Sequence, residues 1–365
     1  MWDVTELTLD ALEIGAGILG TGGGGNPYLG KLEALQQLRA GKLIRVISPD
    51  ELPDDAFVTS VGGMGSPTVS IERVGRGDEC VQAMQALERH LGRRFTHVIP
   101  GEIGGANAMR PMIVAAYMGI PVIDGDGMGR AFPELQMDTF SIYGVAPTPG
   151  ALAEPRGHEV IFDKIADPVT LERYARAVTI QMGGAAGYAF PPMTAEEVRG
   201  AAIPGTVTLA VEIGNAVRTA RAALANPVDA ALAVAGGQRL FHGKIVDVER
   251  RLLGGFARGV LRLEGSGVDT GKSLQIDFQN ENLIARTGEG EILAVVPDLI
   301  CLVDEDSAEP ITTEVVRYGL RVVVIGIPAP KMLKTVPALE VIGPAAFGYA
   351  DVPYVPLPGR YGHHG

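Results

Sequence analysis

Short apolar runs alternate with helical patterns in the first half of the chain. Strand-like runs occupy residues 55–63 (DAFVTSVGG), 96–100 (THVIP) and 120–124 (IPVID). Between them, residues 79–92 (ECVQAMQALERHLG) and 109–119 (MRPMIVAAYMG) have helical patterns. Strands that alternate with helices predict an α/β fold with a parallel sheet. The loops after these strands would lie at the carboxyl ends of the strands, where such sheets bind ligands.

The second half of the chain has a different pattern. A long Ala-rich helical stretch, residues 194–225, leads into runs in which apolar and polar residues alternate, such as KIVDVE and SLQIDF. Alternation with Gly turns between the runs predicts antiparallel β structure. A segment that contains Pro and Gly places the boundary near residue 165. We therefore expect an α/β amino-terminal domain over residues 1–165 and a β-rich carboxy-terminal domain, with a leading helical stretch, over residues 166–365.

A literal G-x-G-x-x-G begins at Gly15 within the segment GAGILGTGGGGNPYLG, residues 15–30. A dinucleotide-binding loop has to follow a strand and open a helix. Here the preceding residues have helical spacing, and Asp10 with Glu13 looks like the cap pair of a helix that begins near Thr8. The glycine motif therefore ends a helix, and we expect no nucleotide cofactor.

Five consecutive residues form the loop that follows this helix. They are Gly22, Gly23, Gly24, Gly25 and Asn26. Their backbone N–H groups, with the start of a second helix behind them, would form a cradle for a carboxylate or phosphate. The alternative is a sharp turn whose glycines supply positive φ angles. One or two glycines suffice for a turn, so four in a row favour close approach by a ligand or by another backbone.

Composition narrows the classes of partner. The net charge of −12 argues against nucleic acid or an anionic membrane as the main partner. The sequence shows no signal-peptide pattern and no apolar run of 18 residues, so we expect a cytoplasmic protein. Cys80 and Cys301 lie far apart in the sequence, which argues against a disulfide framework. A homo-oligomer is compatible with this composition, which does not count subunits.

Eight motifs along the chain resemble one bacterial family. They are GTGGGGNPYLG, VGGMGSP, GGANAMRP, DGDGMGRAFPELQM, GKIVDVERRLLGGFARG, FQNENLIA, VPDLICLVD and GPAAFGYADVPYVPL. The chain resembles, over nearly its whole length, the family named after S-methyl thiohydantoin desulfurase. The resemblance implies an α/β amino-terminal domain and a β-rich carboxy-terminal domain.

The resemblance also implies a reaction. The founding activity of that family converts an S-methyl thiohydantoin acid to the hydantoin and releases methanethiol. The expected function is therefore that of a hydrolase acting on a hydantoin-like five-membered ring. Many relatives look associated with hydantoinase or oxoprolinase enzymes. The alternative is thus a non-catalytic subunit or ligand-binding partner of such a system.

Hydrolysis of a C–S bond at an amidine-like carbon needs an activated water, which a carboxylate base or a metal hydroxide supplies. Asp124 and Asp126 follow a predicted strand, and the glycine between them lets both carboxylates turn to one side. Glu102 follows another strand and would face the same crevice. These three carboxylates are the catalytic candidates; a solvated Asp-Gly turn and an exposed loop acid are the alternatives. Asp124, Asp126 and His242 are the candidate ligands of a divalent metal such as zinc, although no metal-binding motif is visible.

The ligand is expected to be a small anionic cyclic amide or thioamide in a cleft between the domains. Arg130 would hold its carboxylate with a bidentate fork, or form an ion pair with Glu134 four residues later. Asn107 would donate to a substrate oxygen, or serve as a turn residue. Gly63 and Met64 belong to a second Gly-rich loop that would also contact the ligand.

Three further features of the sequence point less specifically to a function. The polar run QNENL, residues 279–283, would line the site at the domain interface or pair across strands at the surface. Ser66 lacks the G-x-S-x-G frame of a nucleophile. His363 and His364 end the chain and are expected to form a tail.

Overall fold

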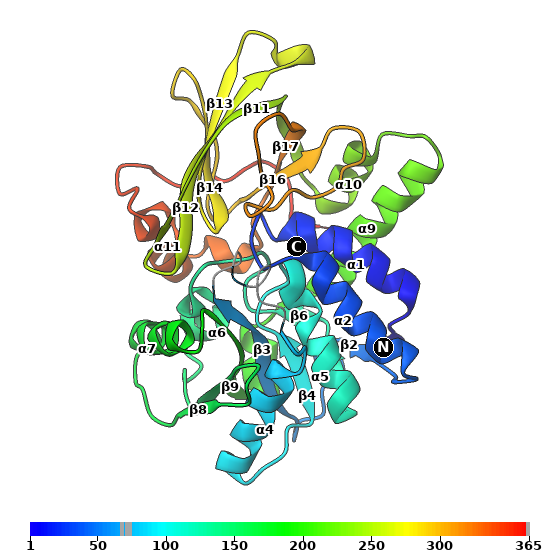
Figure 1. Cartoon of the computed structure of the whole chain (residues 1–365), viewed down its shortest axis with the longest axis vertical. Helices are drawn as coiled ribbons and strands as arrows, with labels where there is room; N and C mark the ends of the chain where they lie inside the picture. Colours follow the sequence, from blue (N-terminus) through cyan, green and yellow to red (C-terminus); the bar gives the residue numbers. More distant parts are fainter. Residues whose placement is uncertain (66–68, 70–74, 363–365) are drawn as a thin grey trace.

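The computed structural model describes residues 1–65, 69 and 75–362. Ser66, His363 and His364 lie outside the described residues. Figure 1 shows two sheets one above the other, with helices α1 (Glu6–Leu19), α2 (Pro27–Arg39), α9 (Thr206–Ala222) and α10 (Pro227–Ala235) along one side. This is the expected mixed α/β architecture, with a sheet that contains parallel strands in the first half and an antiparallel sheet in the second.

The first sheet has eight strands. In spatial order they are β1 (Trp2–Asp3), β2 (Arg45–Ile47), β5 (Val122–Ile123), β4 (His97–Pro100), β3 (Phe57–Gly65), β9 (Ala185–Thr194), β7 (Gly150–Ala153) and β8 (Glu159–Phe162). Strands β2, β5, β4 and β3 run parallel, and the other neighbours are antiparallel. Strand β9 lies after residue 165 in the chain and pairs with β3 in the middle of this sheet.

Helices cover both faces of this sheet. Helices α4 (Glu79–Leu91) and α5 (Arg110–Met118) bury apolar stripes against one face, in the same core as Val61 and Val98. Both helices end at a glycine in the left-handed conformation, Gly92 and Gly119. The other face packs on α6 (Thr139–Ile142) and α8 (Ala195–Ala201). Helix α7 (Pro168–Gln181) lies beside β3 and β9.

The second sheet has seven antiparallel strands, as the alternating pattern predicted. In spatial order they are β15 (Ile292–Val295), β14 (Glu281–Thr287), β13 (Ser273–Gln279), β12 (Phe256–Gly265), β11 (Gln238–Leu253), β17 (Arg321–Ile327) and β16 (Leu299–Asp304). The smaller elements are β6 (Gly125–Asp126), β10 (Ile203–Pro204), α11 (Val336–Ile342), and the 3-10 helices η1 (Pro49–Glu51), η2 (Gly105–Ala108), η3 (Leu135–Met137), η4 (Gly267–Asp269), η5 (Lys331–Lys334) and η6 (Pro344–Phe347). An apolar cluster that includes Phe132 and Leu283 joins the two halves.

Gly15 lies inside helix α1 (Glu6–Leu19), which confirms that the glycine motif ends a helix and does not directly follow a strand. The absence of a side chain there lets α1 cross α9 (Thr206–Ala222) at backbone distance: a Cβ added at Gly15 would lie 1.8 Å from the Ala210 carbonyl oxygen. The first glycine of the motif therefore serves helix packing. The predicted cap pair was wrong, because Thr5 and Thr8 form the capping box of α1.

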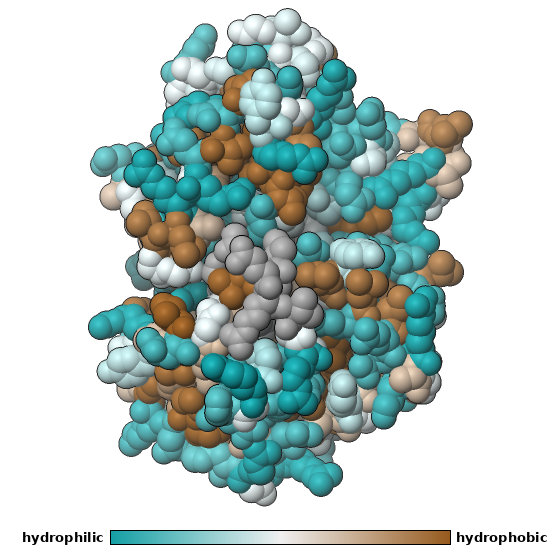
Figure 2. Space-filling model, viewed as in Figure 1, coloured by the Kyte–Doolittle hydropathy of each residue, from teal (hydrophilic) through white to brown (hydrophobic). Residues whose placement is uncertain are grey.

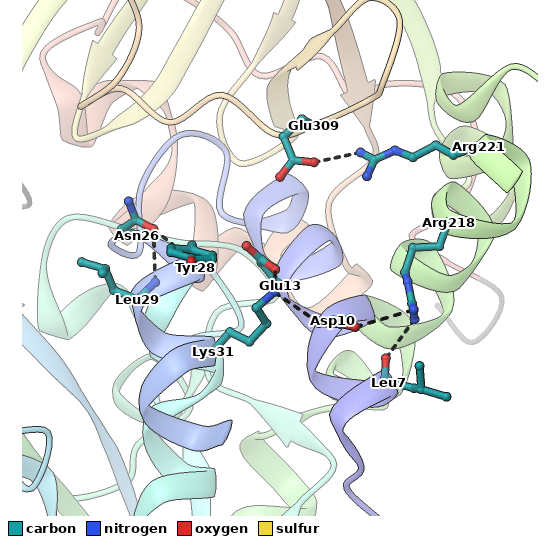
Figure 3. Close-up of polar contacts among 10 residues, drawn as sticks. All are labelled: Leu7, Asp10, Glu13, Asn26, Tyr28, Leu29, Lys31, Arg218, Arg221 and Glu309. Carbon is teal, nitrogen blue, oxygen red and sulfur yellow. Dashed lines mark hydrogen bonds and ion pairs between the residues drawn. The ribbon is translucent and has the colours of Figure 1, made fainter. Parts of the chain in front are cut away.

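Figure 3 shows how polar contacts fix these helices to one another. Lys31 of α2 (Pro27–Arg39) pairs with Asp10 and Glu13 of α1 at 3.2 and 2.5 Å. Arg218 of α9 donates to the Leu7 carbonyl oxygen at 3.0 Å. The helix start that sequence reasoning assigned to Asp10 and Glu13 is thus a contact between helices.

The face of the molecule drawn in Figure 2 is mostly polar. Figure 2 shows apolar residues in separate patches among hydrophilic ones, several of them near the level where the two halves meet. Among the described residues, no helix is long and apolar enough to cross a membrane. Helix α10 (Pro227–Ala235) and helix α9 instead bury their apolar residues in the core that α1 shares with β16 and β17.

Candidate functional site

A cavity of about 330 Å³ lies where the two halves of the chain meet. The glycine loop before α2, the end of β3, the loop after β4, strand β9 and the turn between β13 and β14 all contribute to its wall. Its size falls within the range of small-molecule sites. Carboxyl groups from both halves line it, so its chemistry depends on their protonation.

Glu102 is buried in the wall of this cavity, in the loop that follows β4. Its Oε1 accepts a hydrogen bond from the Asn107 side-chain amide, and its Oε2 accepts one from the Phe132 N–H at 3.2 Å. Burial raises the pKa of Glu102 to about 8, although these two N–H donors act to lower it. A proton on Glu102 occupies a lone pair that neither N–H uses.

Asn107 connects Glu102 to the central strand β3. It lies in η2, and its Oδ1 accepts the Gly63 N–H at 2.7 Å while its Nδ2 donates to Glu102. A Cβ added at Gly63 would lie 3.3 Å from that Oδ1, so a side chain there would crowd the contact. Asn107, Gly63 and Met64 all line the cavity. Gly63 and Met64 lie inside strand β3, where they pair with β9, which corrects their expected position in a loop.

Glu281 is another buried carboxyl group in the cavity wall, beside Glu102 and Glu79, and it comes from the carboxy-terminal half. Asn280 adopts a left-handed conformation (φ 57°) in the turn between β13 and β14, and Glu281 follows it. The Glu281 Oε2 has no hydrogen-bond partner among the described residues. Burial and the charge of Glu102 raise the pKa of Glu281 well above its usual value. Sequence reasoning noted the run 279–283 but did not single out this acid.

Tyr188 and Arg110 also line the cavity, and neither was expected there from the sequence. The Tyr188 hydroxyl lies against two glycines: a Cβ at Gly101 would lie 1.9 Å from it, and one at Gly62 would lie 2.5 Å from it. Arg110 Nη1 donates to Glu33 Oε2 at 2.7 Å. Arg110 brings a positive charge to a wall that is otherwise rich in carboxyl groups.

The glycine loop contributes only part of itself to the cavity. Gly24, Gly25 and Asn26 line it, whereas Gly22 and Gly23 do not. The Gly22 carbonyl oxygen accepts the Thr313 N–H at 2.9 Å. A Cβ at Gly24, where φ is +79°, would lie 2.3 Å from the Gly104 carbonyl oxygen. Both expected reasons for the glycine run therefore apply at Gly24: close approach by another backbone and a positive φ angle, which Gly22 and Gly25 also have.

Asn26 has a definite structural duty in addition to its place at the cavity. Its Oδ1 accepts the Tyr28 and Leu29 N–H groups at 3.0 and 3.3 Å and caps α2 (Figure 3). The first N–H groups of α2 are thus partly occupied by protein.

Asp124 and Asp126 lie outside the cavity wall, which corrects their expected place beside Glu102. Asp124 accepts the Thr208 N–H at 3.0 Å and the Thr208 hydroxyl, near the start of α9. Asp126 is fully buried, and its Oδ2 accepts the Ile103, Met128 and Gly129 N–H groups at 2.8, 3.0 and 2.8 Å. Burial raises the pKa of Asp126 to about 7 against these donors. Both acids thus organise backbone around the site.

The expected metal ligands do not converge. His242 lies on β11, where its Nε2 is 2.7 Å from Glu305 Oε2, and it does not line the cavity. Over the described ranges, no group of three or more His, Cys, Asp and Glu side chains is arranged to hold a metal ion. The set Asp124, Asp126 and His242 therefore does not fit a zinc site.

Arg130 does not have the expected role of holding the ligand carboxylate. It is fully buried and makes five hydrogen bonds: Nε to Ala131 O, Nη1 to Pro297 O and Asp298 O, and Nη2 to Thr21 Oγ1 and Asn282 O, at 2.9–3.2 Å. A guanidinium has five N–H donors, so this set uses all of them. Arg130 neither lines the cavity nor pairs with Glu134; it ties the two halves together.

Glu134 and Cys80 also line the cavity. Glu134 accepts a hydrogen bond from the Gln136 side chain. The Cys80 thiol donates to the Gly62 carbonyl oxygen at 3.2 Å, and burial raises its pKa to about 12. Burial also raises the pKa of Cys301 to about 12 within the core. Both thiols therefore stay protonated at neutral pH.

Comparison with known proteins places the whole chain. The model of the S-Me-THD-like N-terminal domain matches residues 7–164, and that of the S-Me-THD-like C-terminal domain matches residues 166–357. An X-ray crystal structure of a protein from Chromobacterium violaceum is similar, with a TM-score of 0.79 and 25% identity over 98% of this chain and 100% of that one. No curated protein matches. The chain belongs to the S-Me-THD-like family, that of S-methyl thiohydantoin desulfurase-like proteins.

Proposed function

We propose that this protein is a hydrolase that replaces the S-methyl group of a thiohydantoin-type ring with oxygen, and that Glu102 activates the water. The observation that carries the proposal is the Glu102 carboxyl, buried in the cavity wall and oriented by Asn107 and Phe132. Family membership supports a desulfurase-like enzyme. A pKa of about 8 suits a group that has to both accept and return a proton near neutral pH.

The reaction consumes one water molecule. The water oxygen bonds to the ring carbon that carries sulfur, the Glu102 carboxylate takes a water proton, and the C=N electron pair moves to the ring nitrogen, which takes up a proton. The C–S bond then breaks with its electron pair on sulfur as the added oxygen forms the carbonyl, and the proton that the hydroxyl group loses balances the one that the ring nitrogen took up. Glu102 returns its proton to the leaving sulfur, so the products are the hydantoin and methanethiol.

The ligand carboxylate needs a positive partner in the same cavity. With Arg130 fully occupied, Arg110 and Arg176 are the arginines that line the cavity. Arg176 already donates through Nε to Glu172 and through Nη2 to the Pro133 carbonyl oxygen, whereas Arg110 donates to Glu33 through Nη1, so Arg110 is the better candidate. A guanidinium can bind a carboxylate through two parallel hydrogen bonds. The proposed ligand is thus an anionic five-membered ring, with its carboxylate near Arg110 and its reacting carbon near Glu102.

Turnover separates this function from its alternative. The purified chain is incubated with an S-methyl thiohydantoin that carries a carboxylate side chain, and methanethiol is measured with a thiol reagent while calorimetry measures binding of the hydantoin product. We expect catalytic methanethiol release. Hydantoin binding without methanethiol release would contradict the enzyme and support a binding subunit of a hydantoinase or oxoprolinase system.

A further inference from the structure

We propose that Glu281 is a second catalytic group of this cavity, the acid that delivers a proton to the ring nitrogen of the ligand. The inference rests on the proposed function and extends it to the carboxy-terminal half of the chain. No sequence motif indicates Glu281, so this role is inferred from where its side chain lies.

The Glu281 side chain is buried in the wall of the cavity. Glu281 is 2% exposed, lines the cavity, and has one carboxyl oxygen, Oε2, without a hydrogen-bond partner among the described residues. A buried polar atom without a partner costs free energy, so proteins rarely keep one without a use. A ligand atom that accepts a proton from Oε2 would satisfy it.

The glycine loop leaves room for the carboxyl group of Glu281. A Cβ added at Gly23 would lie 1.8 Å from Glu281 Oε1 and 2.5 Å from its carboxyl carbon. The φ angle of Gly23 is outside the left-handed region, so its backbone conformation does not itself require glycine. Space for Glu281 is therefore the reason for glycine at this position.

Burial and nearby carboxyl groups favour the protonated form of Glu281. Burial and Glu102 raise its pKa, Glu314 acts in the same direction, and Arg130 opposes them. Arg130 does not neutralise it through a direct contact, because all five of its N–H groups are used elsewhere. Two carboxyl groups that interact in one low-dielectric site share protons, with at least one protonated at neutral pH.

The two acids can then divide the chemistry. Glu281 gives its proton to the ring nitrogen as water attacks, while Glu102 takes a proton from that water. When the carbonyl forms and the C–S bond breaks, the hydroxyl proton returns to Glu281 and Glu102 protonates the leaving sulfur. Each carboxyl group ends the cycle as it began.

The test is methanethiol release at pH 8 by the full chain and by Glu281→Gln, with product affinity measured in parallel by calorimetry. Gln keeps the size and a hydrogen-bond donor but has no acidic proton. We expect kcat to fall by about 100-fold or more, with the Kd of the hydantoin within about threefold of the unsubstituted protein. Glu281→Asp should regain part of the rate, since it restores an acid.

A matched control is Glu212→Gln. Glu212 lies in α9, also has a carboxyl oxygen without a partner among the described residues, and is outside the cavity wall. Its kcat should stay within about threefold.

Three results would overturn the proposal. They are an unchanged kcat in Glu281→Gln, a loss of hydantoin affinity with kcat unchanged, and an equal loss of kcat in the Glu212 control. If Glu281→Gln does not fold, Glu281→Asp decides, with a lower kcat at unchanged Kd expected and an unchanged kcat contradicting it. No methanethiol release by the unsubstituted protein would overturn the proposed function as well, so the two failures are distinguishable.

Discussion

Asn107 donates to the Glu102 carboxylate through Nδ2 and accepts the Gly63 N–H at 2.7 Å through Oδ1. One side chain therefore fixes the carboxyl group of the loop after β4 relative to strand β3. It also favours the charged form of Glu102, because a carboxylate is a better acceptor than a carboxylic acid. Asn107 thus orients the proposed base and lowers its pKa, against the larger effect of burial.

Asn107→Leu should shift the pH dependence of the reaction upward. Leucine has a similar size, keeps the site dry and removes the hydrogen bond that lowers the pKa of Glu102. The midpoint of kcat/KM against pH should move up by about one unit, since a hydrogen bond to a charged group contributes about 1.5 kcal/mol or more. The measurement is methanethiol release between pH 6 and 10. An unchanged midpoint in a variant of normal melting temperature would show that Asn107 does not act on the base.

Stability should depend on pH through the same carboxyl group. Below its ordinary pKa Glu102 is protonated in both states; between that value and about 8 the unfolded chain loses the proton while the folded chain keeps it. The folded state then binds more protons, so the free energy of unfolding falls as pH rises, by about 1.4 kcal/mol per pH unit for one group.

Urea unfolding at pH 5 and pH 7.5 checks this. The stability of Glu102→Gln relative to the unsubstituted protein should increase between the two pH values, because glutamine cannot titrate. A difference that stays constant with pH would be inconsistent with a raised pKa at Glu102.

Gly23→Ala should impair the reaction by displacing Glu281. The added Cβ would lie 1.8 Å from the Glu281 Oε1, so the carboxyl group has to move. Since Gly23 is not in the left-handed region, the backbone itself accepts alanine. We expect kcat to fall by about tenfold or more.

The control for this change is Gly200→Ala. Gly200 lies in α8, and a Cβ there would meet nothing within 4 Å. Alanine should stabilise that helix by about 0.4–1 kcal/mol and leave kcat unchanged. Equal activity of the two variants would show that glycine at position 23 is not needed to position Glu281.

Arg130→Lys should destabilise the protein without specifically weakening ligand binding. Lysine keeps the charge but has three donors instead of five, so buried carbonyl oxygens from both halves lose their partners. Breaking buried charged contacts of this kind costs about 3–5 kcal/mol. Thermal unfolding measures the loss, with exposed Arg251→Lys as the control. Unchanged stability together with lost hydantoin affinity would return Arg130 to the ligand-binding set.

The periodicity of the chain predicted the fold well. The parallel strands β4 and β5, the helices between them and the antiparallel second sheet follow from local spacing of apolar residues. Glu102 and Asn107 were also accessible to sequence reasoning, because polar residues after parallel strands gather at one edge of the sheet.

The rest of the site depends on contacts between distant segments. Asp126 and Arg130 belong to the most recognisable motif of the chain, yet their hydrogen bonds go to backbone groups in the interior. Glu281 and Tyr188 are close to Glu102 only because β14 and β9 pack there. The local sequence gives the type of each residue, but it does not show which distant backbone groups form hydrogen bonds with it.

The most direct test of the account is methanethiol release by Glu102→Gln beside Glu289→Gln, an exposed Glu on the turn between β14 and β15. For the unsubstituted protein, kcat/KM should rise with pH and level off above about 8, because Glu102 must lose its proton to act as the base. Glu102→Gln should lose about 100-fold or more in kcat and the pH dependence with it, while Glu289→Gln keeps both. A Glu102→Gln variant that keeps its rate and its pH profile would contradict the central claim.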